Sequence, residues 1–377
     1  MERINACVIG GGIAGLSLAS RLSRHGSVLV LEAEEAPGYH ASGRSVAFAH
    51  FGLGEMVVRT LTALSLPELA AQPRDDRAPC AALHPALHIA SAAEAEALAT
   101  LEQVHKQFGC DFVRLTGKEA RELVPILKSG ADHCEAAILD RGALKLDADA
   151  MLQGHLRDLR EGGGDLVCRS RVLGISRLGE EWILDCEGQS YAAPLVVNAA
   201  GAWADEVARM AGVPQIGIKP RRRTVISFEA PSNIDVSRWP FTKTVGAGFY
   251  MLPEGSGRLL ASPMDEGKTG PCDAAPEEID IATIAHRIEQ ETQMSISRIT
   301  HSWAGLRSFA EDELPVIGFA KHAPGFFWCA GQGGAGFQTS PALARIGEAI
   351  ALGLEWPDEF ATGGLSPDLF SPARLGV

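Results

Sequence analysis

The sequence has no Cys-x-x-Cys pair and no uninterrupted apolar stretch of 18 residues. Its eight cysteines are scattered, most of them in apolar segments, so we expect reduced thiols in a reducing compartment and no disulfide scaffold. Without a long apolar stretch, no transmembrane segment is predicted. The N-terminus lacks both a basic region and a cleavable apolar region, which predicts no signal peptide and a cytoplasmic location.

Positively charged residues are also fewer than negatively charged ones. Lys and Arg number 34 against 47 Asp and Glu, which gives a net charge of −13. This balance makes nucleic acids and anionic membranes poor default partners. With 377 residues, of which 46% are hydrophobic, the chain can bury a large core as two domains or one large α/β unit.

A nucleotide-binding motif lies at the N-terminus. A buried strand runs into a Gly-x-Gly-x-x-Gly sequence over Gly10–Gly15, followed by a helix, a second buried strand and Glu32. Gly10 permits a tight turn, Gly12 lets the backbone approach a pyrophosphate, and Gly15 lets helix and strand pack closely. The helix N-terminus attracts the anion, and Glu32 can accept hydrogen bonds from ribose hydroxyls. The order of these parts predicts a dinucleotide site.

The rest of the chain mixes helical and strand periodicities, which predicts an α/β (α+β) fold. The expected helices lie near residues 55–69, 93–108, 118–123, 147–160, 279–294 and 341–352. The expected strands lie at 165–168, 172–177, 181–186, 190–192, 195–198 and 325–330, with alternating strand patterns over about 215–310.

Five segments together resemble the FAD-dependent D-amino acid oxidase/glycine oxidase superfamily, and within it bacterial D-arginine dehydrogenase-type D-amino acid dehydrogenases. In chain order they are Val8–Gly15, Pro37–Ser45, Val196–Trp203, Trp303–Ser308 and Gln332–Ser340. The resemblance covers nearly the whole chain. It implies a discontinuous Rossmann-like FAD-binding domain (1–80, 145–215 and 310–377). A substrate-binding domain with a mixed or antiparallel sheet (81–144 and 216–309) is interleaved with it.

The resemblance implies FAD, bound non-covalently. The matching cofactor residues are Gly10, Gly12, Ala14, Gly15, Glu32, Ala33, Ser42, Gly43, Arg44, Ser45, His50, Val172, Ala200, Gly201, Gly331, Gly333, Gly334, Ala335, Gly336, Phe337 and Gln338. Arg44 either offsets the pyrophosphate charge or forms a surface salt bridge. The late loop over 331–338 either presents N–H groups to the flavin's pyrimidine edge or forms a second mononucleotide site. Covalent attachment through Cys329 is not expected, because covalently linked members carry their cysteine near the position of Ser308.

The resemblance also implies a carboxylate clamp. Arg307 matches the arginine that pairs bidentately with a substrate carboxylate, and Arg223 is a second contact with Arg222 as its rival. A polyanion such as tRNA is the alternative ligand of the arginine triplet 221–223. Tyr250 either contacts the substrate and faces the flavin or packs as a half-buried strand aromatic.

Some positions depart from the D-arginine dehydrogenase pattern. Phe48 and Leu53 stand where those enzymes have a polar histidine and a tyrosine, and Pro85–Leu87 stands where they have an acidic residue. We therefore expect a neutral or apolar substrate side chain. His50 either restores polarity at the site or packs in the core. His84 and His88 are spaced like a metal pair, but Pro85 intervenes and no third ligand is in view, so no metal site is expected.

The resulting functional prediction is oxidation of an amino acid to its imino and 2-oxo acid by hydride transfer to flavin N5. The resemblance implies that this amino acid has the D configuration. The expected electron acceptor is a quinone or another compound in place of oxygen, because residues 257–262 offer aliphatic side chains where sarcosine-type oxidases have a lysine, and Arg258 adjoins a turn. The alternatives are oxidation of an N-substituted amino acid or a 2-hydroxy acid, or a role as a flavoprotein subunit of a larger assembly.

Overall fold

The computed structural model describes residues 2–72, 77–231, 234–255, 257–296 and 298–377. One half of the molecule is built on a sheet of short, buried, apolar strands. Their order is β10 (Asp165–Val167), β3 (Val28–Leu31), β2 (Ala6–Ile9), β14 (Leu195–Asn198), β22 (Phe326–Ala330) and β21 (Val316–Phe319). All neighbours are parallel except β21, which runs antiparallel to β22. Continuous apolar runs suit a parallel sheet that is covered on both faces.

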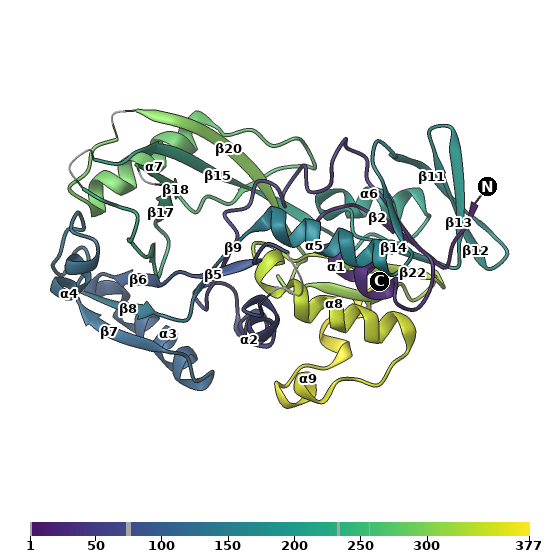
Figure 1. The fold of residues 1–377 in the computed structure, drawn as a ribbon, viewed down its shortest axis with the longest axis horizontal. Coiled ribbons are helices and arrows are strands. Elements are labelled where there is room, and N and C mark those ends of the chain that lie inside the picture. The colour runs from purple at the N-terminus through teal and green to yellow at the C-terminus, as the bar shows by residue number, and fades with distance from the viewer. Residues whose placement is uncertain (1, 73–76, 232–233, 256, 297) are drawn as a thin grey trace.

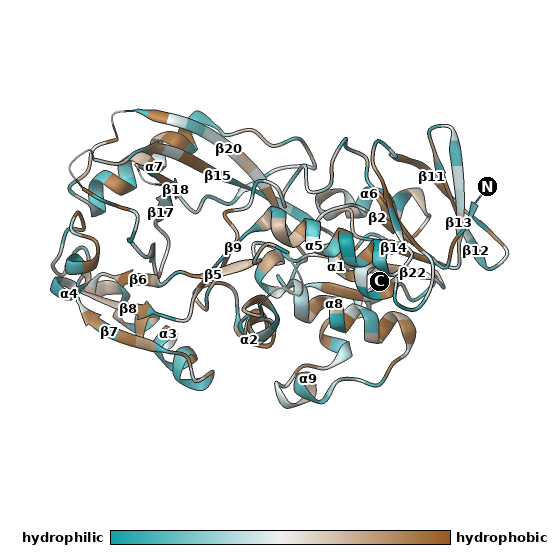
Figure 2. Cartoon of the chain, viewed as in Figure 1, coloured by the Kyte–Doolittle hydropathy of each residue, from teal (hydrophilic) through white to brown (hydrophobic). Residues whose placement is uncertain are grey.

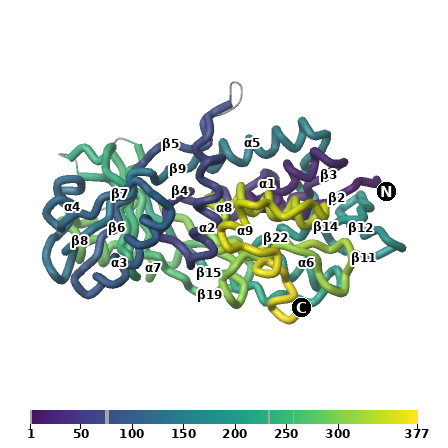
Figure 3. Tube along the Cα trace, turned by 90° about the horizontal axis from the view of Figure 1, so that it is seen from below, coloured from purple at the N-terminus to yellow at the C-terminus, as the bar shows by residue number. Residues whose placement is uncertain are grey.

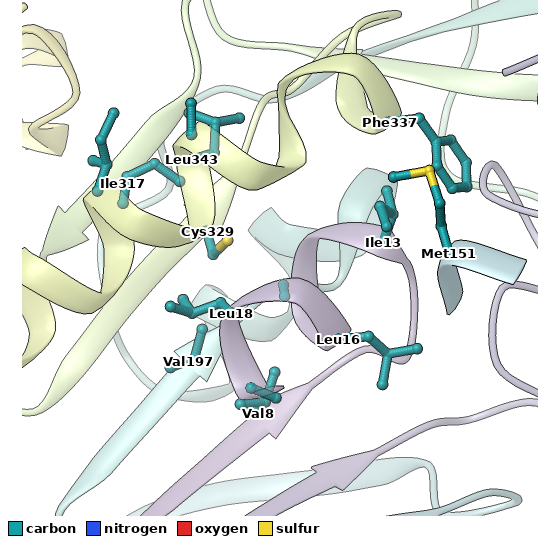
Figure 4. Packing of buried hydrophobic residues seen from close by; sticks show 14 of the residues in the cluster. Val8, Ile13, Leu16, Leu18, Met151, Val197, Ile317, Cys329, Phe337 and Leu343 are labelled. Atoms are coloured by element: carbon teal, nitrogen blue, oxygen red, sulfur yellow. The ribbon is translucent and has the colours of Figure 1, made fainter. Parts of the chain in front are cut away.

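Alternate residues of these strands pack into two different cores. Val8 of β2 faces the helices α1 (Ile13–Leu22), α5 (Ala148–Glu161) and α8 (Gly336–Leu352). In Figure 4 it lies in one packed group with Leu18 of α1 and Leu343 of α8. The neighbouring Cys7 faces the opposite core. The elements that cover this second face are α6 (Ala204–Met210), β11 (Val172–Leu178), β12 (Glu181–Cys186) and β13 (Gln189–Ala193), with β1 (Glu2–Arg3) paired to β13.

The other half is built on a mixed sheet that is largely antiparallel (Figure 1). Its strands are, in order, β19 (Gly267–Lys268), β15 (Lys219–Glu229), β18 (Arg258–Ser262), β17 (Tyr250–Glu254), β16 (Phe241–Thr244), β6 (Ala86–Ala90), β8 (Ala136–Asp140) and β7 (Phe112–Thr116). The long strand β20 (Ile299–Phe309) also pairs with β15. Only β16 and β6 are parallel neighbours within this described sheet.

Smaller elements complete the two halves. The helices are α2 (Met56–Leu69), α3 (Ala95–Gln107), α4 (Gly117–Leu123), α7 (Glu278–Glu291) and α9 (Asp358–Thr362). The short 3₁₀ helices are η1 (Ala92–Glu94), η2 (Gly201–Trp203), η3 (Pro367–Leu369) and η4 (Pro372–Leu375). A small sheet orders β4 (Phe48–Ala49), β9 (Leu144–Leu146) and β5 (Ala81–Leu83).

Two perpendicular views place these halves at opposite ends of an elongated molecule. In Figures 1 and 3, β2, β14 and β22 lie at one end and β6, β7 and β8 at the other, with α2 between them. Both termini belong to the end with the parallel sheet. The strands of both sheets are largely apolar, whereas the outer hairpin of β11 and β12 carries hydrophilic segments (Figure 2). Among the helices of the described residues, none has the length and apolar character needed to cross a bilayer.

The predicted α/β class is confirmed, and the predicted helices and strands are found with small shifts at their ends. The clearest correction concerns α8, which begins at Gly336 and not near residue 341. Pro341 therefore lies inside the helix, where it cannot donate to the Phe337 carbonyl. The Ser340 hydroxyl donates to that carbonyl instead, at 3.0 Å, so the early turns remain satisfied. The domain boundaries drawn from the sequence stay a prediction.

Candidate active site

A cavity of about 550 Å³ extends from the carboxyl ends of β2 and β3 to the inner face of the mixed sheet. In doubly wound α/β folds, ligands bind beyond the carboxyl ends of the parallel strands. Here the cavity continues from that position toward strands of the second sheet. One long ligand, or two ligands end to end, can therefore contact both halves of the molecule.

The β2–α1 turn can be made only with glycine at two positions. Gly10 has φ of +111°, and a Cβ there would lie 2.5 Å from the Ala199 carbonyl oxygen. A Cβ on Gly15 would lie 2.0 Å from the Gly10 carbonyl oxygen. The turn thus leads directly from the strand into α1, whose N-terminus opens on the cavity. Such a helix N-terminus is suited to an anion such as a pyrophosphate.

Two polar side chains hold the backbone around this turn. Glu32, at the end of β3, accepts hydrogen bonds from the Gly11 N–H at 2.8 Å and the Glu34 N–H at 2.9 Å. The Ser42 hydroxyl oxygen accepts from the Ile13 N–H at 3.0 Å. A carboxylate has about four acceptor positions. Glu32 therefore retains capacity to accept from hydroxyl groups of a ligand in the cavity.

Arg44 lines the cavity, but its guanidinium is bound by the protein. It donates to the Ala274 carbonyl at 2.9 Å and the Ala304 carbonyl at 3.1 Å, and it pairs with Asp273. The sequence left two roles for Arg44, a contact with the pyrophosphate or a salt bridge, and the structure contains the salt bridge. A contact between Arg44 and a pyrophosphate stays a prediction.

The late glycine-rich loop leads from β22 to α8 and closes one side of the cavity. Its conformation is fixed by the Gly333 N–H, which donates to the Ser308 carbonyl at 2.9 Å. A Cβ on Gly334 would lie 2.7 Å from the Arg307 guanidinium carbon. Gly334 therefore leaves the space that Arg307 occupies, which links the loop to the carboxylate clamp predicted from the sequence.

Most predicted cofactor residues line the cavity: Gly10, Gly12, Ala14, Glu32, Ala33, Ser42, Arg44, Ser45, His50, Val172, Ala200, Gly201, Gly333, Gly334, Gly336 and Phe337. Five others do not line it: Gly15, Gly43, Gly331, Ala335 and Gln338. Gln338 instead binds the Thr62 hydroxyl at 2.7 Å and the His50 backbone, so it positions neighbouring residues. The Glu32 carboxylate, the N-terminus of α1 and the glycine turn all fit a dinucleotide cofactor.

A model of the FAD dependent oxidoreductase family (DAO) matches residues 5–348. The chain belongs to this family. Its cofactor is therefore FAD, and the protein is an FAD-dependent oxidoreductase. The predicted superfamily is confirmed. The finer resemblance to D-arginine dehydrogenases stays a prediction.

The chain is also similar to several known members of the DAO family. It is 25% identical over 432 residues to the mouse "FAD-dependent oxidoreductase domain-containing protein 1", covering 100% of this chain and 86% of that protein. The crystal structure of L-proline dehydrogenase from P. horikoshii has a TM-score of 0.80 at 21% identity, covering 100% of this chain and 98% of that one. The structure of glycine oxidase from Geobacillus kaustophilus has a TM-score of 0.78 at 22% identity, covering 97% of this chain and 99% of that one. The two solved structures establish the shared DAO fold.

In this DAO-family chain, FAD is expected to be held without a covalent bond through Cys329. The Cys329 thiol is buried, lies 3.7 Å from the Ala14 carbonyl oxygen and does not line the cavity. Burial raises the pKa of this thiol to about 12. It is therefore protonated and a poor nucleophile near neutral pH.

The three consecutive arginines of β15 have separate surroundings. Arg221 pairs with Glu266 and Glu313 and lies over the Phe309 ring. Arg222 pairs with Glu277 and Asp280, away from the cavity. Arg223 is the member that lines the cavity, and only 8% of it is exposed. The structure therefore favours Arg223 over its rival Arg222, as the family resemblance did.

Arg223 and Arg307 converge in the cavity beside two acidic side chains, Asp265 and Glu266. The Arg223 Nε donates to the Asp265 carbonyl at 2.7 Å, and its NH2 lies 3.4 Å from Glu266 Oε1. Arg307 NH1 lies 3.8 Å from the same oxygen. Burial, together with the charge of Arg223, lowers the pKa of Arg307 to about 10. Glu266 pairs with both guanidiniums and Asp265 with Arg223, so donors that remain on Arg307 have capacity for another anion.

Tyr250 and His50 also line the cavity and are buried. The His50 Nδ1 accepts from the Gly52 N–H at 3.0 Å, which assigns the proton of the neutral ring to Nε2. Burial and the charge of Lys243 lower the pKa of His50 to about 3, so the ring is neutral at physiological pH. His50 is thus both buried and part of the cavity lining, which combines the two roles that the sequence left open.

Lys243 is the main residue that the sequence analysis missed. It lies on β16, only 8% of it is exposed, and it lines the cavity. The prediction of a pocket without a cation near the flavin was based on residues 257–262 alone. In that segment Arg258 is indeed exposed. The pocket is not free of cations, because β16, two strands away in the same sheet, supplies a buried lysine. The alternation of Phe241 and Lys243 on one face of a short strand is the pattern that could have indicated it.

Proposed function

We propose that the protein oxidises an amino acid of D configuration, with a neutral or apolar side chain, at the C–N bond beside its carboxylate. The product is the imino acid, which hydrolyses to the 2-oxo acid. The observation that carries this proposal is the convergence of Arg223 and Arg307 in the cavity of a DAO-family chain. The D configuration rests on the resemblance to D-amino acid dehydrogenases.

The two arginines are suited to binding a carboxylate. Guanidinium groups bind carboxylates through two parallel hydrogen bonds, and such bonds are strong where water is excluded. Arg223 is fixed by its bond to the Asp265 carbonyl, and Arg307 is confined by the loop at Gly334. A substrate held by its carboxylate between them has a defined orientation in the cavity.

The remaining lining supports an uncharged substrate side chain. Phe48 stacks on Phe241 with ring centroids 4.5 Å apart, and Leu53 lies nearby in the same lining. The aromatic ring of Tyr250 packs against Phe241 at 5.4 Å. Apolar groups of this kind exclude water and stabilise an apolar side chain by burial.

FAD, when bound, supplies the group that accepts two electrons from the substrate. Gly10, Glu32 and Ser42 would hold it at the parallel-sheet end. For its reoxidation we propose a quinone or another acceptor in place of oxygen. This choice rests on the resemblance to dehydrogenases alone. Because Lys243 lines the cavity, the absence of a cation no longer supports an acceptor other than oxygen.

The test is anaerobic bleaching of the bound flavin by a panel of compounds. The panel holds neutral D-amino acids, their L-enantiomers, D-arginine, sarcosine and 2-hydroxy acids. Bleaching by neutral D-amino acids in preference to the others is expected. Bleaching by sarcosine or hydroxy acids alone would replace this function with oxidation of an N-substituted amino acid or a hydroxy acid. Mixing the reduced protein with air-saturated buffer then tests the acceptor, and rapid reoxidation with stoichiometric hydrogen peroxide would make it an oxidase.

A further inference from the structure

Lys243 lies in a row of polar residues that crosses the mixed sheet. It is in register with Tyr250 on β17 and with His88 on β6, and Tyr250 is in register with Ser262 on β18. Paired residues on adjacent strands project from the same face of a sheet. Lys243 and Tyr250 both line the cavity, so this row leads from the substrate end of the cavity into the interior.

The charges that act on Lys243 are mostly positive. They come from Arg223 of β15, Arg307 of β20 and Arg59 of α2, with Glu94 of η1 as the opposing acid. The Glu94 carboxylate is engaged by the Ser91 N–H and hydroxyl, both at 3.0 Å. Within the described residues, no carboxylate forms an ion pair with Lys243.

The histidines beside Lys243 supply no negative charge. His50 and His88 have lowered pKa values because of burial and the nearby lysine, so both rings are neutral. Their centroids lie 5.3 Å apart, and His105 follows 6.2 Å beyond His88. In the described part of the chain, neither ring nitrogen of His88 has a hydrogen-bond partner. The two rings beside Lys243, His50 and His88, are therefore neutral, and the buried carboxylate of Asp140 lies 3.3 Å from the more distant His105.

This environment disfavours an ammonium group. Burying a charge without a counter-ion is unfavourable, and a lysine avoids that penalty by losing its proton. Burial and the arginines lower the pKa of Lys243 to about 8. Among the described residues, the one hydrogen-bond partner of Lys243 Nζ is the Thr244 carbonyl, at 2.9 Å. A neutral amine can donate that bond and still keep its lone pair.

We propose that Lys243 is a catalytic base that takes a proton from the ammonium group of the substrate. The proposal rests on the function proposed above, in which the arginines hold the substrate carboxylate beside it. One N–H bond of the substrate ammonium breaks and one N–H bond forms on Nζ, so the lysine becomes charged and no electrons are exchanged. The substrate nitrogen then has the lone pair that assists loss of hydride from Cα. A base that titrates near the operating pH is effective in this role.

A first experiment measures the protonation of Lys243 without any substrate. The purified holoprotein is labelled with trace acetic anhydride between pH 6 and 11, and each lysine is quantified by mass spectrometry. The expected labelling midpoint of Lys243 is about 8, against the ordinary lysine value of about 10.4, and the exposed Lys268 in the same sheet is labelled as the internal reference. A midpoint for Lys243 equal to that of Lys268 would overturn the proposal.

A second experiment compares Lys243→Met with Lys243→Arg by anaerobic rapid mixing. Both variants are expected to reduce the flavin about 10²- to 10⁴-fold more slowly at saturating substrate, with substrate Kd changed less than about threefold. In the wild type, the rate of flavin reduction is expected to rise with pH around 8 as Lys243 loses its proton. This rise disappears in both Lys243 variants. Lys268→Met is the matched control and keeps the wild-type rate and pH profile, and thermal unfolding checks that each variant folds.

A third variant, Lys243→Ala, leaves room for an added amine, and ethylamine is expected to restore part of the rate. If Lys243→Arg keeps the wild-type rate, the lysine acts only as a fixed charge and the base role is wrong. If Lys243→Met affects only the Kd of substrates with a second carboxylate, the lysine is a binding residue and the base role is again wrong. Failure of every amine substrate to bleach the wild-type flavin would overturn the proposed function itself, which separates the two failures.

Discussion

The two ends of the cavity differ in how their residues are spaced along the chain. At the parallel-sheet end, the glycine turn, α1 and Glu32 come from one segment of about 25 residues. At the mixed-sheet end, four strands supply the lining residues Arg223, Lys243, Tyr250 and Arg307, and Glu266 comes from the segment between β18 and β19. The first end is specified by local backbone geometry. The second exists only once the sheet has aligned its strands.

The comparison also concerns charge. The parallel-sheet end offers backbone N–H groups and a carboxylate, which suit a pyrophosphate and ribose hydroxyls. The mixed-sheet end gathers buried and half-buried cations beside the carboxylates of Asp265 and Glu266. A substitution at the first end should therefore act on cofactor binding, and one at the second end on substrate binding and proton transfer.

The largest effect is expected for Gly15→Val at the parallel-sheet end. A Cβ at this position would lie 2.0 Å from the Gly10 carbonyl oxygen, so the turn cannot close around the cofactor. The purified variant should lack bound flavin, as measured by its visible absorbance. Gly154→Ala in α5, where a Cβ meets nothing within 4 Å, is the control and should retain the flavin. A yellow Gly15→Val protein would show that the turn tolerates a side chain.

The next effect is expected for Arg307→Met at the mixed-sheet end. Removing this partner should weaken binding of the carboxylate substrate by roughly 2–5 kcal/mol, because a buried charged hydrogen bond is lost. The measurement is the ratio of kcat/KM values for wild type and variant, with flavin content unchanged. Arg222→Met, whose side chain binds Glu277 and Asp280 outside the cavity, is the control. A change below about threefold would contradict the clamp.

A smaller effect is expected on stability as a function of pH. The pKa of Lys243 is lowered in the folded protein to about 8 from 10.5, so between these values the unfolded chain binds more protons. The free energy of unfolding of the wild type should therefore increase as the pH rises from 8 to 10.5. Below pH 8 the buried ammonium group destabilises the folded protein by its full amount. Lys243→Met should be more stable than wild type at pH 7, with the difference shrinking toward pH 10.5. Denaturant titration of both proteins across this range measures the difference, and a constant difference would indicate an ordinary lysine.

The smallest effect is expected for Glu266→Gln. This carboxylate lies 3.4 Å from Arg223 and 3.8 Å from Arg307, where it competes with the substrate carboxylate. Because 40% of its side chain is exposed, the pairing contributes only about 0.5–1 kcal/mol. The variant should bind a carboxylate inhibitor two- to fivefold more tightly in a fluorescence titration. Weaker binding would show that Glu266 orients the arginines.

Much of the cofactor end could be predicted from the sequence, because its determinants are local. Gly10 and Gly15 are required by contacts between residues only a few positions apart, and Glu32 follows the second strand directly. The start of α8 was missed, because a proline usually marks a first turn and the Ser340 hydroxyl that satisfies the Phe337 carbonyl is not apparent from periodicity. Arg44 shows the same limit, since its partner Asp273 lies 229 positions away.

By itself the sequence determined the α/β class and the FAD cofactor, and it named the arginines of the proposed carboxylate clamp, since each follows from a turn, a periodicity or a family motif. Only the tertiary structure decided which arginine of the triplet enters the cavity, and that Lys243 joins it among neutral histidines. The reason is that a side chain's charge depends on the burial and charges around it. Those surroundings come from strands distant in sequence, whose register is fixed only when the sheet forms.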